Sequence, residues 1–229
     1  MNQKRAVVTG GSRGIGRAIV ERLLREGWQV CTCSRNYQDL VRLVEELGQE
    51  GLHVRSCNVG DRWSVKAFVE FCVERMGGLE LLVNNASILG SRVSVEAYPE
   101  ELWEEVIKVN INGVFYTTKY CLPYMGKGSL VVNVSSGAGK RPAPYWGAYA
   151  VSKFGLEGFS LLLAEELKGR GIKVYALNPG ATRTQMRAQA YPEEDPNSLK
   201  PPDKVAEFLL KLLKAEAPSG SYDYREGLY

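Results

Sequence analysis

The chain has 229 residues, of which 45% are hydrophobic and 24% are charged, and its formal net charge is +3. A chain of this length and apolar content can bury one large core, so we expect a single domain over residues 1–229. Lysine and arginine are spread along the sequence rather than gathered in a run, which argues against a nucleic-acid surface. The apolar run at residues 6–9 is too short for a signal peptide or a membrane span, so a cytoplasmic protein is expected.

Cysteine and histidine usage excludes two further classes of site. The five cysteines lack CxxC spacing, which predicts buried free thiols rather than disulfides or a metal site. The single histidine, His53, lies in a strand-like segment and is expected to be a packing residue. Without a catalytic histidine, the chain cannot be a serine-histidine hydrolase.

Short apolar runs alternate with longer amphipathic segments along the chain. The apolar runs predict strands at 6–9, 29–34, 52–59, 79–84, 130–135 and 172–177, mostly of the buried parallel type. Helices are predicted at 15–26, 37–47 and 62–76, each followed by a glycine that suits a left-handed cap. The tail at 219–229 is expected to supply a seventh strand. The alternation predicts an α/β fold with a doubly wound, seven-stranded parallel sheet and helices on both faces.

One stretch breaks this alternation. Residues 183–202 contain four prolines and show no helical or strand period. A connection of this length is uncommon inside a compact domain and is usually functional. We therefore expect this segment to be an irregular substrate loop or lid.

A glycine-rich segment, Thr9 to Gly16, follows the first predicted strand and opens the first predicted helix. Glycines at this position allow a tight turn, and a pyrophosphate can approach backbone N–H groups at the helix N-terminus. The spacing is GxxxGxG rather than GxGxxG, and a turn that merely connects strand to helix is the alternative. The position in the fold favours a dinucleotide site.

Arginines flank the expected cofactor site. About twenty residues beyond the loop, where an NAD-preferring site carries an acid, the second strand ends at Ser34 and is followed by Arg35. Arg35 and Arg13 could both bind a 2′-phosphate through charge-assisted hydrogen bonds. The alternatives are two solvated arginines, or an ion pair between Arg35 and the nearby Asp39. The pattern favours NADP(H) over NAD(H).

Tyr149 and Lys153 are four residues apart in a segment expected to be helical, so they would lie on one face. An ammonium beside the phenol would favour phenolate and lower the pKa of Tyr149 from about 10 towards the operating pH. A phenol with that pKa can both give and take a proton. Taken alone, the pair could equally be two residues on a solvated helix face.

The motifs together carry a family resemblance over essentially the whole chain. In order they are the glycine-rich loop, Asn84-Asn85-Ala86, Asn110, Ser136, Tyr149 with Lys153, and Asn178-Pro179-Gly180. With these motifs the chain resembles the short-chain dehydrogenase/reductase family, which implies a Rossmann fold. The separation between Ser136 and Tyr149 is the one that the family uses, and it selects Ser136 over Ser135.

The resemblance implies a role for each catalytic residue. Tyr149 would be the general acid in carbonyl reduction and the base in alcohol oxidation, while hydride moves at nicotinamide C4. Ser136 would donate a hydrogen bond to the substrate oxygen, and Lys153 would lower the pKa of Tyr149 and bind the nicotinamide ribose. Asn110 would hold a water that links Lys153 to solvent; otherwise it is a helix-interior amide bonded to backbone.

The same resemblance implies a set of cofactor contacts. Asn58 and Val59 would meet the adenine, although Asn58 stands where the family commonly has Asp, and Ser87 replaces a usual glycine after Ala86. The C-terminal tail is closer to carbonyl-reductase-like members than to 3-oxoacyl reductases. The residues expected to bind the cofactor are Gly10, Ser12, Arg13, Gly14, Ile15, Gly16, Arg35, Asn58, Val59, Asn85, Ala86, Tyr149, Lys153, Pro179, Gly180 and Thr182.

Partners and substrate are less sharply indicated. The segments 102–116 and 154–163 are apolar on more than one side, which favours a homodimer or homotetramer over cover by loops of the same chain. A small carbonyl or alcohol is the expected substrate; a 3-oxoacyl thioester, or a silent dinucleotide-sensing protein, is the alternative. The apolar candidates for a substrate pocket are Ile88, Leu89, Tyr145, Trp146, Met186 and Tyr191, and the basic ones are Arg92, Arg183 and Arg187.

Overall fold

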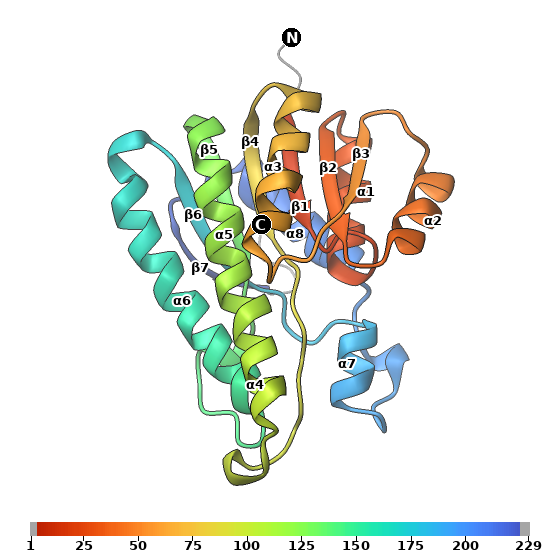
Figure 1. The fold of residues 1–229 in the computed structure, drawn as a ribbon, viewed down its shortest axis with the longest axis vertical. Helices are drawn as coiled ribbons and strands as arrows, with labels where there is room; N and C mark the ends of the chain where they lie inside the picture. The colour runs from red at the N-terminus through yellow and green to blue at the C-terminus, as the bar shows by residue number, and fades with distance from the viewer. Residues whose placement is uncertain (1–3, 225–229) are drawn as a thin grey trace.

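The computed structural model describes residues 4–224, which form one seven-stranded parallel sheet (Figure 1). The strand order is β3-β2-β1-β4-β5-β6-β7, so the chain moves outward from β1 in one direction and then in the other. The predicted doubly wound parallel sheet is therefore confirmed, and its carboxyl ends lie on one edge. The strands are β1 (Arg5–Thr9), β2 (Gln29–Ser34), β3 (Leu52–Ser56), β4 (Leu79–Asn84), β5 (Met125–Val134), β6 (Lys173–Asn178) and β7 (Gly220–Asp223).

Helices cover both faces of the sheet (Figure 1). One face carries α1 (Gly14–Arg25), α2 (Tyr37–Leu47) and α8 (Asp203–Lys214). The other carries α3 (Arg62–Met76), α5 (Gly113–Cys121) and α6 (Gly147–Leu167), with α4 (Glu100–Ile107) beside α6. A short helix, α7 (Gln185–Ala190), lies below the sheet at the lower right of Figure 1. Short turns complete the order: η1 (Val95–Ala97), the π-helical η2 (Lys108–Asn112), η3 (Leu122–Tyr124), η4 (Gly137–Gly139), η5 (Lys168–Arg170) and η6 (Pro196–Ser198).

The sheet separates two apolar cores because successive side chains of a strand point to opposite faces. Val8 of β1 packs with α1 and α8, whereas its neighbour Val7 packs with α3 and α6. Both valines are at most 1% exposed. Burial on both faces explains why the strands read as continuous apolar runs. No helix among residues 4–224 combines the length and apolar composition that a bilayer span requires.

Two predicted elements differ in extent. The strand expected at 52–59 ends at Ser56. Cys57 N–H still bonds the Ser34 carbonyl of β2, and the Asn58 side chain then turns the chain by accepting from Gly60 N–H. The predicted strand at 130–135 starts earlier, at Met125, across an irregular register with β4. The seventh strand is confirmed at Gly220–Asp223; the rest of the predicted tail, 225–229, lies outside the described residues.

The segment 183–202 is not irregular throughout, which corrects the sequence prediction. It contains α7 and η6, and the hydroxyl of Thr184 caps α7 by accepting from Arg187 N–H. The prolines obscured this, although all four follow α7 and none interrupts it. The predicted left-handed cap is confirmed at Gly77, which ends α3. Gly27 and Gly48 also have positive φ just past α1 and at the end of α2, but Gly48 has a ψ of 174° and is therefore not in the left-handed helical region.

Candidate cofactor and catalytic site

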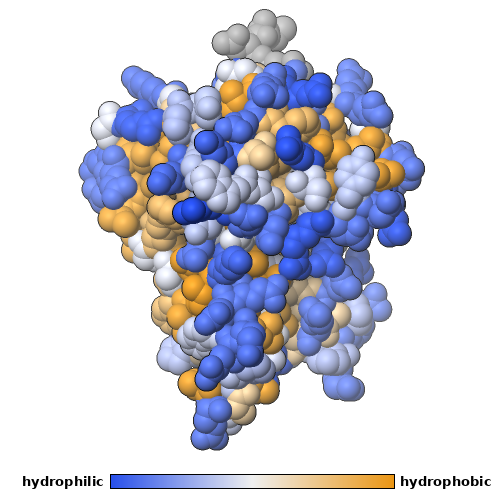
Figure 2. Space-filling view, in the orientation of Figure 1, coloured by the Kyte–Doolittle hydropathy of each residue, from blue (hydrophilic) through white to orange (hydrophobic). Residues whose placement is uncertain are grey.

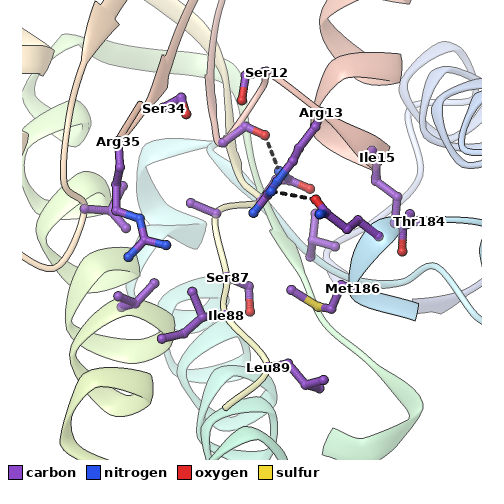
Figure 3. Close-up of a pocket in the computed structure, with 18 of the residues that line it drawn as sticks. Ser12, Arg13, Ile15, Ser34, Arg35, Ser87, Ile88, Leu89, Thr184 and Met186 are labelled. Carbon is purple, nitrogen blue, oxygen red and sulfur yellow. Dashed lines mark hydrogen bonds between the residues drawn. The ribbon is translucent and has the colours of Figure 1, made fainter. Parts of the chain in front are cut away.

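A cavity of about 730 Å³ opens at the carboxyl ends of the strands, with wall residues from the β1–α1 loop, the ends of β2 and β4, α6 and α7 (Figure 3). This is where a doubly wound sheet holds its ligands, because the chain leaves β1 and β4 in opposite directions there. Most residues predicted to bind the cofactor line it: Gly10, Ser12, Arg13, Gly14, Ile15, Arg35, Val59, Asn85, Ala86, Tyr149, Lys153 and Pro179.

The side chain of Asn85 holds the glycine-rich loop in place through hydrogen bonds. Its amide donates to the carbonyls of Thr9 and Gly10, at 3.0 and 3.1 Å. Gly16 lies against the same contact, since a Cβ on Gly16 would be 2.3 Å from the Gly10 carbonyl oxygen. The start of α1 has no side-chain cap and no acidic residue in its first turn. Its free N–H groups and positive dipole end suit a pyrophosphate.

The two arginines reach the cavity from different elements. Arg13 donates to the Gln185 side chain of α7 at 2.7 Å, and Arg35 lies across the cavity from it (Figure 3). Arg35 is paired with Glu105 of α4 at 3.4 Å, and both side chains are about half exposed. Asp39 instead accepts a hydrogen bond from Asn36, so the alternative pairing of Arg35 with Asp39 is wrong.

Tyr149 lines the cavity, and the Ser136 hydroxyl lies beside its phenol. Tyr149 is only 7% exposed. Burial raises the pKa of Tyr149, and the nearby Ser136 hydroxyl acts in the opposite direction. A phenol held protonated beside a hydroxyl donor is suited to give a proton to a substrate oxygen.

Lys153 does not have the effect on the pKa of Tyr149 that the sequence predicted. The residue is 3% exposed, and its ammonium donates to the Val134 carbonyl at 2.8 Å and lies 5.5 Å from the centre of the Tyr149 ring. It therefore does not lower the pKa of Tyr149, which is raised. Burial lowers the pKa of Lys153 itself to about 8, while the nearby carboxylate of Glu157 partly offsets that effect.

Asn110 lies in the π-helical turn η2, a distortion often found at functional sites. Its amide group exchanges hydrogen bonds with the backbone N–H and carbonyl of Ile88, and it also donates to Ser152, the neighbour of Lys153. These contacts agree with the alternative in which this amide is bonded to backbone. They leave one lone pair on the Asn110 oxygen for a further donor.

Four predicted cofactor residues do not line the cavity: Gly16, Asn58, Gly180 and Thr182. Asn58 is exposed and its amide oxygen is used within its own turn. Thr182 is buried and donates to the carbonyl of Gly180, while the neighbouring Thr184 lines the cavity. The sequence missed several other wall residues, because no motif marks them: Cys33, Ser34, Asn36, Cys57, Leu102, Val109, Thr184, Gln185 and Gln189.

Apolar residues predicted for the substrate end form a cluster around Tyr149. Leu89, Trp146, Met186 and Tyr191 pack there. Tyr145 was wrongly included, since it is 63% exposed on a backbone turn with positive φ. The aromatic rings of Trp146 and Tyr149 lie 5.5 Å apart. The cluster places an apolar wall beside the phenol.

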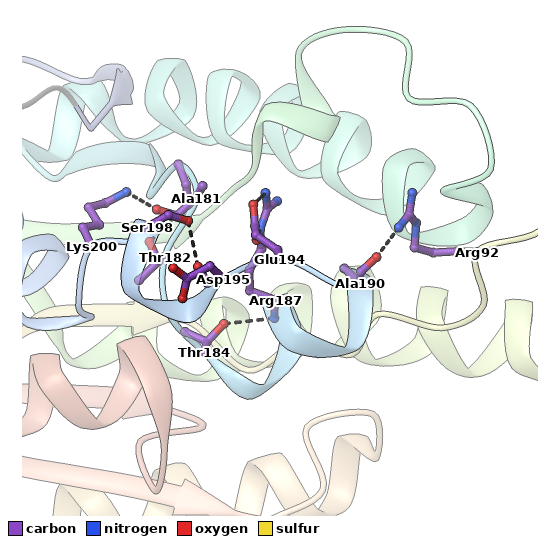
Figure 4. A network of polar contacts seen from close by, with 11 residues as sticks. Arg92, Ala181, Thr182, Thr184, Arg187, Ala190, Glu194, Asp195, Ser198 and Lys200 are labelled. Atoms are coloured by element: carbon purple, nitrogen blue, oxygen red, sulfur yellow. Dashed lines mark hydrogen bonds and ion pairs between the residues drawn. The ribbon is translucent and has the colours of Figure 1, made fainter. Parts of the chain in front are cut away.

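The basic residues near this cluster are tied to the protein (Figure 4). Arg92 donates to the carbonyl of Ala190 at the end of α7, and its guanidinium lies over Trp146 and Tyr191 at 4.9 and 4.6 Å. Arg187 makes a two-pronged ion pair with Glu194 at 2.6 and 2.7 Å. Arg92 and Arg187 thus hold the 183–202 segment together and against the rest of the site.

A buried proton donor beside a cavity shaped for a dinucleotide defines an oxidoreductase with a pyridine-nucleotide cofactor. The sequence model described as short chain dehydrogenase matches residues 4–195. The chain is 34% identical over 224 residues to the uncharacterized oxidoreductase YciK of Escherichia coli K12, covering 93% of this chain and 87% of that protein.

Solved structures agree with that match. A Shigella flexneri 2a protein complexed with NADP has a TM-score of 0.90 and 31% identity, with 97% of each chain covered. An actinorhodin polyketide ketoreductase variant with NADPH has a TM-score of 0.88 and 30% identity, with 99% of this chain and 97% of that chain covered. The chain belongs to the short-chain dehydrogenase family, as the sequence motifs predicted, and it is an enzyme that acts on CH–OH groups.

Proposed function

We propose that this enzyme transfers hydride between NADP(H) and a small carbonyl or alcohol, with Tyr149 as the general acid and base. The observation that carries the proposal is that Tyr149 and Lys153 line the same cavity as the glycine-rich loop, with the Ser136 hydroxyl beside the phenol. Residues predicted from separate motifs thus converge at one place. This convergence argues against a silent dinucleotide sensor, which has no use for a buried proton donor.

The residues divide the reaction between them. A nicotinamide bound in the cavity supplies hydride at C4. Tyr149 gives its proton to the carbonyl oxygen, and Ser136 donates a hydrogen bond to the same oxygen as negative charge develops. Lys153 would bind the nicotinamide ribose when the cofactor is present, and the remaining lone pair of Asn110 would hold a water that returns protons towards Lys153. Pro179 and Val59, which line the cavity, would contact the nicotinamide and the adenine respectively. Asn58, Gly180 and Thr182 do not line it and would act by shaping the turns that hold these two residues.

NADP(H) is favoured over NAD(H) because both arginines border the cavity and can bind a 2′-phosphate. The similar Shigella flexneri and ketoreductase structures were solved with NADP and NADPH. Replacing Arg35 by Asp is expected to weaken NADPH binding on the order of 10- to 100-fold. NADH affinity should change by less than about 3-fold, since NADH carries no 2′-phosphate. Fluorescence titration of both nucleotides measures the difference.

Glu105 provides the matched variant for that titration. Its carboxylate holds the Arg35 guanidinium that the 2′-phosphate needs. Exposed ion pairs are weak, so Glu105→Gln should tighten NADPH binding only about 2- to 5-fold and leave NADH unchanged. Equal effects of Arg35→Asp on the two nucleotides would contradict the phosphate role of Arg35.

The substrate is proposed to be a small apolar carbonyl, because an apolar wall stands beside Tyr149. A 3-oxoacyl thioester is the second candidate, favoured by the likeness to a polyketide ketoreductase. NADPH oxidation measured across ketones, aldehydes, quinones and 3-oxoacyl thioesters distinguishes them. No turnover with any of these carbonyls would contradict the proposed activity. The 183–202 segment is proposed to close over the substrate as a lid, with Met186 and Gln189 facing the cavity.

We also propose a homodimer or homotetramer in the cytoplasm. Apolar areas appear on the face that α5 and α6 present in Figure 2, and large exposed apolar residues lie along these helices. Such a patch marks an interaction surface. Sedimentation at micromolar concentration should give a dimer or tetramer, and Leu161→Glu with Leu162→Glu should shift it towards monomer. The exposed apolar residues of this face are Phe115, Val151, Phe154, Leu161 and Leu162. A monomeric wild-type protein would contradict the assembly.

The cysteines support the proposed cytoplasmic location. The five buried free cysteines suit a reducing compartment.

A further inference from the structure

Lys153 is a buried cation without a directly bound anion. Its ammonium donates to the Val134 carbonyl, and it forms no ion pair with a carboxylate among residues 4–224. A buried charge is costly unless some opposite charge offsets the loss of water. The proposed mechanism requires Lys153 to stay charged, so the protein needs another source of negative potential nearby.

Glu157 lies one turn further along α6, on the same face as Lys153. One carboxylate oxygen accepts from the Ser135 hydroxyl at the end of β5, and the other accepts from the Ser221 hydroxyl of β7 at 2.8 Å. No arginine or lysine pairs with it within the described part of the chain. Its carboxylate is thus held by two neutral donors, which do not cancel its charge.

The contacts between the end of β5 and α6 form a regular pattern. Three consecutive residues, 134, 135 and 136, contact three helix residues spaced four apart, 153, 157 and 149 respectively. The two outer contacts belong to the catalytic machinery. The middle one, between Ser135 and Glu157, fixes the backbone that presents the Val134 carbonyl to Lys153 and the Ser136 hydroxyl to Tyr149.

We propose that Glu157 is a positioning residue of this site, which aligns the end of β5 with α6 and provides the counter-charge that keeps the Lys153 ammonium protonated. The inference rests on the proposed function, because it is the proposed mechanism that requires Lys153 to be charged. In a poorly solvated region, a carboxylate stabilises a charged ammonium more strongly the closer the two groups lie. Glu157 is the carboxylate that opposes the burial of Lys153.

Other groups around Lys153 do not supply this charge. From its own helix comes the neutral Tyr149 phenol, from β5 two hydroxyls and a carbonyl, and from η2 the amide of Asn110. The η4 turn packs a glycine on the Lys153 backbone, and the lysine that follows that turn, Lys140, is paired with Asp223 of β7. Among these neighbours Glu157 carries the unpaired negative charge.

The test is to titrate Lys153 directly by NMR of lysine labelled at the ε-carbon, with the signal assigned by its loss in Lys153→Met. Glu157→Gln keeps an acceptor for the serines and removes the charge. We expect the pKa of Lys153 to fall by about one unit in Glu157→Gln. Ser221→Ala, which removes one anchor but no charge, should move it by less than about 0.3 unit. Glu166→Gln, an exposed charge change on the same helix, should leave it unaltered.

Activity gives a second, separate reading. In Glu157→Gln the alkaline loss of NADPH-dependent reduction should begin about one pH unit lower, with KM for NADPH at pH 6 within about 3-fold of wild type. An unchanged Lys153 pKa in a folded Glu157→Gln, or an equal fall in Ser221→Ala and Glu166→Gln, would overturn the proposal. If no carbonyl is reduced by the wild type, the proposed function fails, while the NMR titration still decides the role of Glu157.

Discussion

Replacing Tyr149 by Phe is expected to lower the turnover number for NADPH-dependent reduction by about 10²- to 10⁴-fold, the range that a positioned general acid contributes. The change removes only the phenolic hydroxyl, which lies beside Ser136. The ring stays packed against Trp146 in the same apolar cluster, so the cavity keeps its shape. NADPH affinity, measured by fluorescence titration, should therefore stay within about 3-fold of wild type. Steady-state NADPH oxidation with the best carbonyl substrate measures the loss.

Tyr145→Phe is the matched control, because it removes a phenol four residues earlier that is 63% exposed. Its turnover should equal that of the wild type. Because burial holds the pKa of Tyr149 above its ordinary value, the phenol is protonated at neutral pH and is ready to act as an acid. Unimpaired turnover in Tyr149→Phe would show that the proton comes from elsewhere.

The sheet could be predicted from the sequence because its information is local. Parallel strands buried on both faces leave continuous Val and Leu runs, and the glycines after α1, α2 and α3 mark where each helix ends. The motifs that define the site also lie at fixed positions after strands, so their meeting at one sheet edge follows from the topology. This is why Gly10, Tyr149 and Lys153 were assigned to one cavity.

The contacts between distant segments could not be predicted. Arg35 pairs with Glu105, 70 positions away, and nothing in the pattern around Arg35 distinguishes that carboxylate from Asp39. Asn110 bonds the backbone at Ile88, which depends on how η2 packs under the β4 loop. Such pairings depend on the three-dimensional packing of helices whose surfaces all carry similar charges.

The shift of the Tyr149 pKa was predicted in the wrong direction for a related reason. Helical spacing places Lys153 on the same face as Tyr149, but it does not say how deeply the pair is buried or where the ammonium points. In the structure desolvation raises the pKa of the phenol, and the Lys153 ammonium, which turns to the Val134 carbonyl, does not offset it. Spacing predicts neighbours, whereas the dielectric around them depends on the folded core.

Gly16→Ala is the second change with a large expected effect. An added Cβ would lie 2.3 Å from the Gly10 carbonyl oxygen and 2.4 Å from the Asn85 amide nitrogen. Neither atom can move freely, because Asn85 also donates to that carbonyl and to Thr9. Overpacking of this kind costs about 1–3 kcal/mol, so Tm should fall by about 5 °C. NADPH affinity should fall on the order of 10-fold or more, because the displaced loop no longer cradles the pyrophosphate.

Gly169→Ala separates the steric effect from the loss of a glycine as such. A Cβ at Gly169 meets nothing within 4 Å, and its φ lies outside the positive region. That variant should keep wild-type affinity and a Tm within about 2 °C. If Gly16→Ala lowered Tm but bound NADPH normally, the loop would have a structural role only. If both properties were retained, the close approach of α1 to the loop would not constrain this residue. Loss of both is expected, because one contact, from Asn85 to Gly10, supports the turn and shapes the phosphate site.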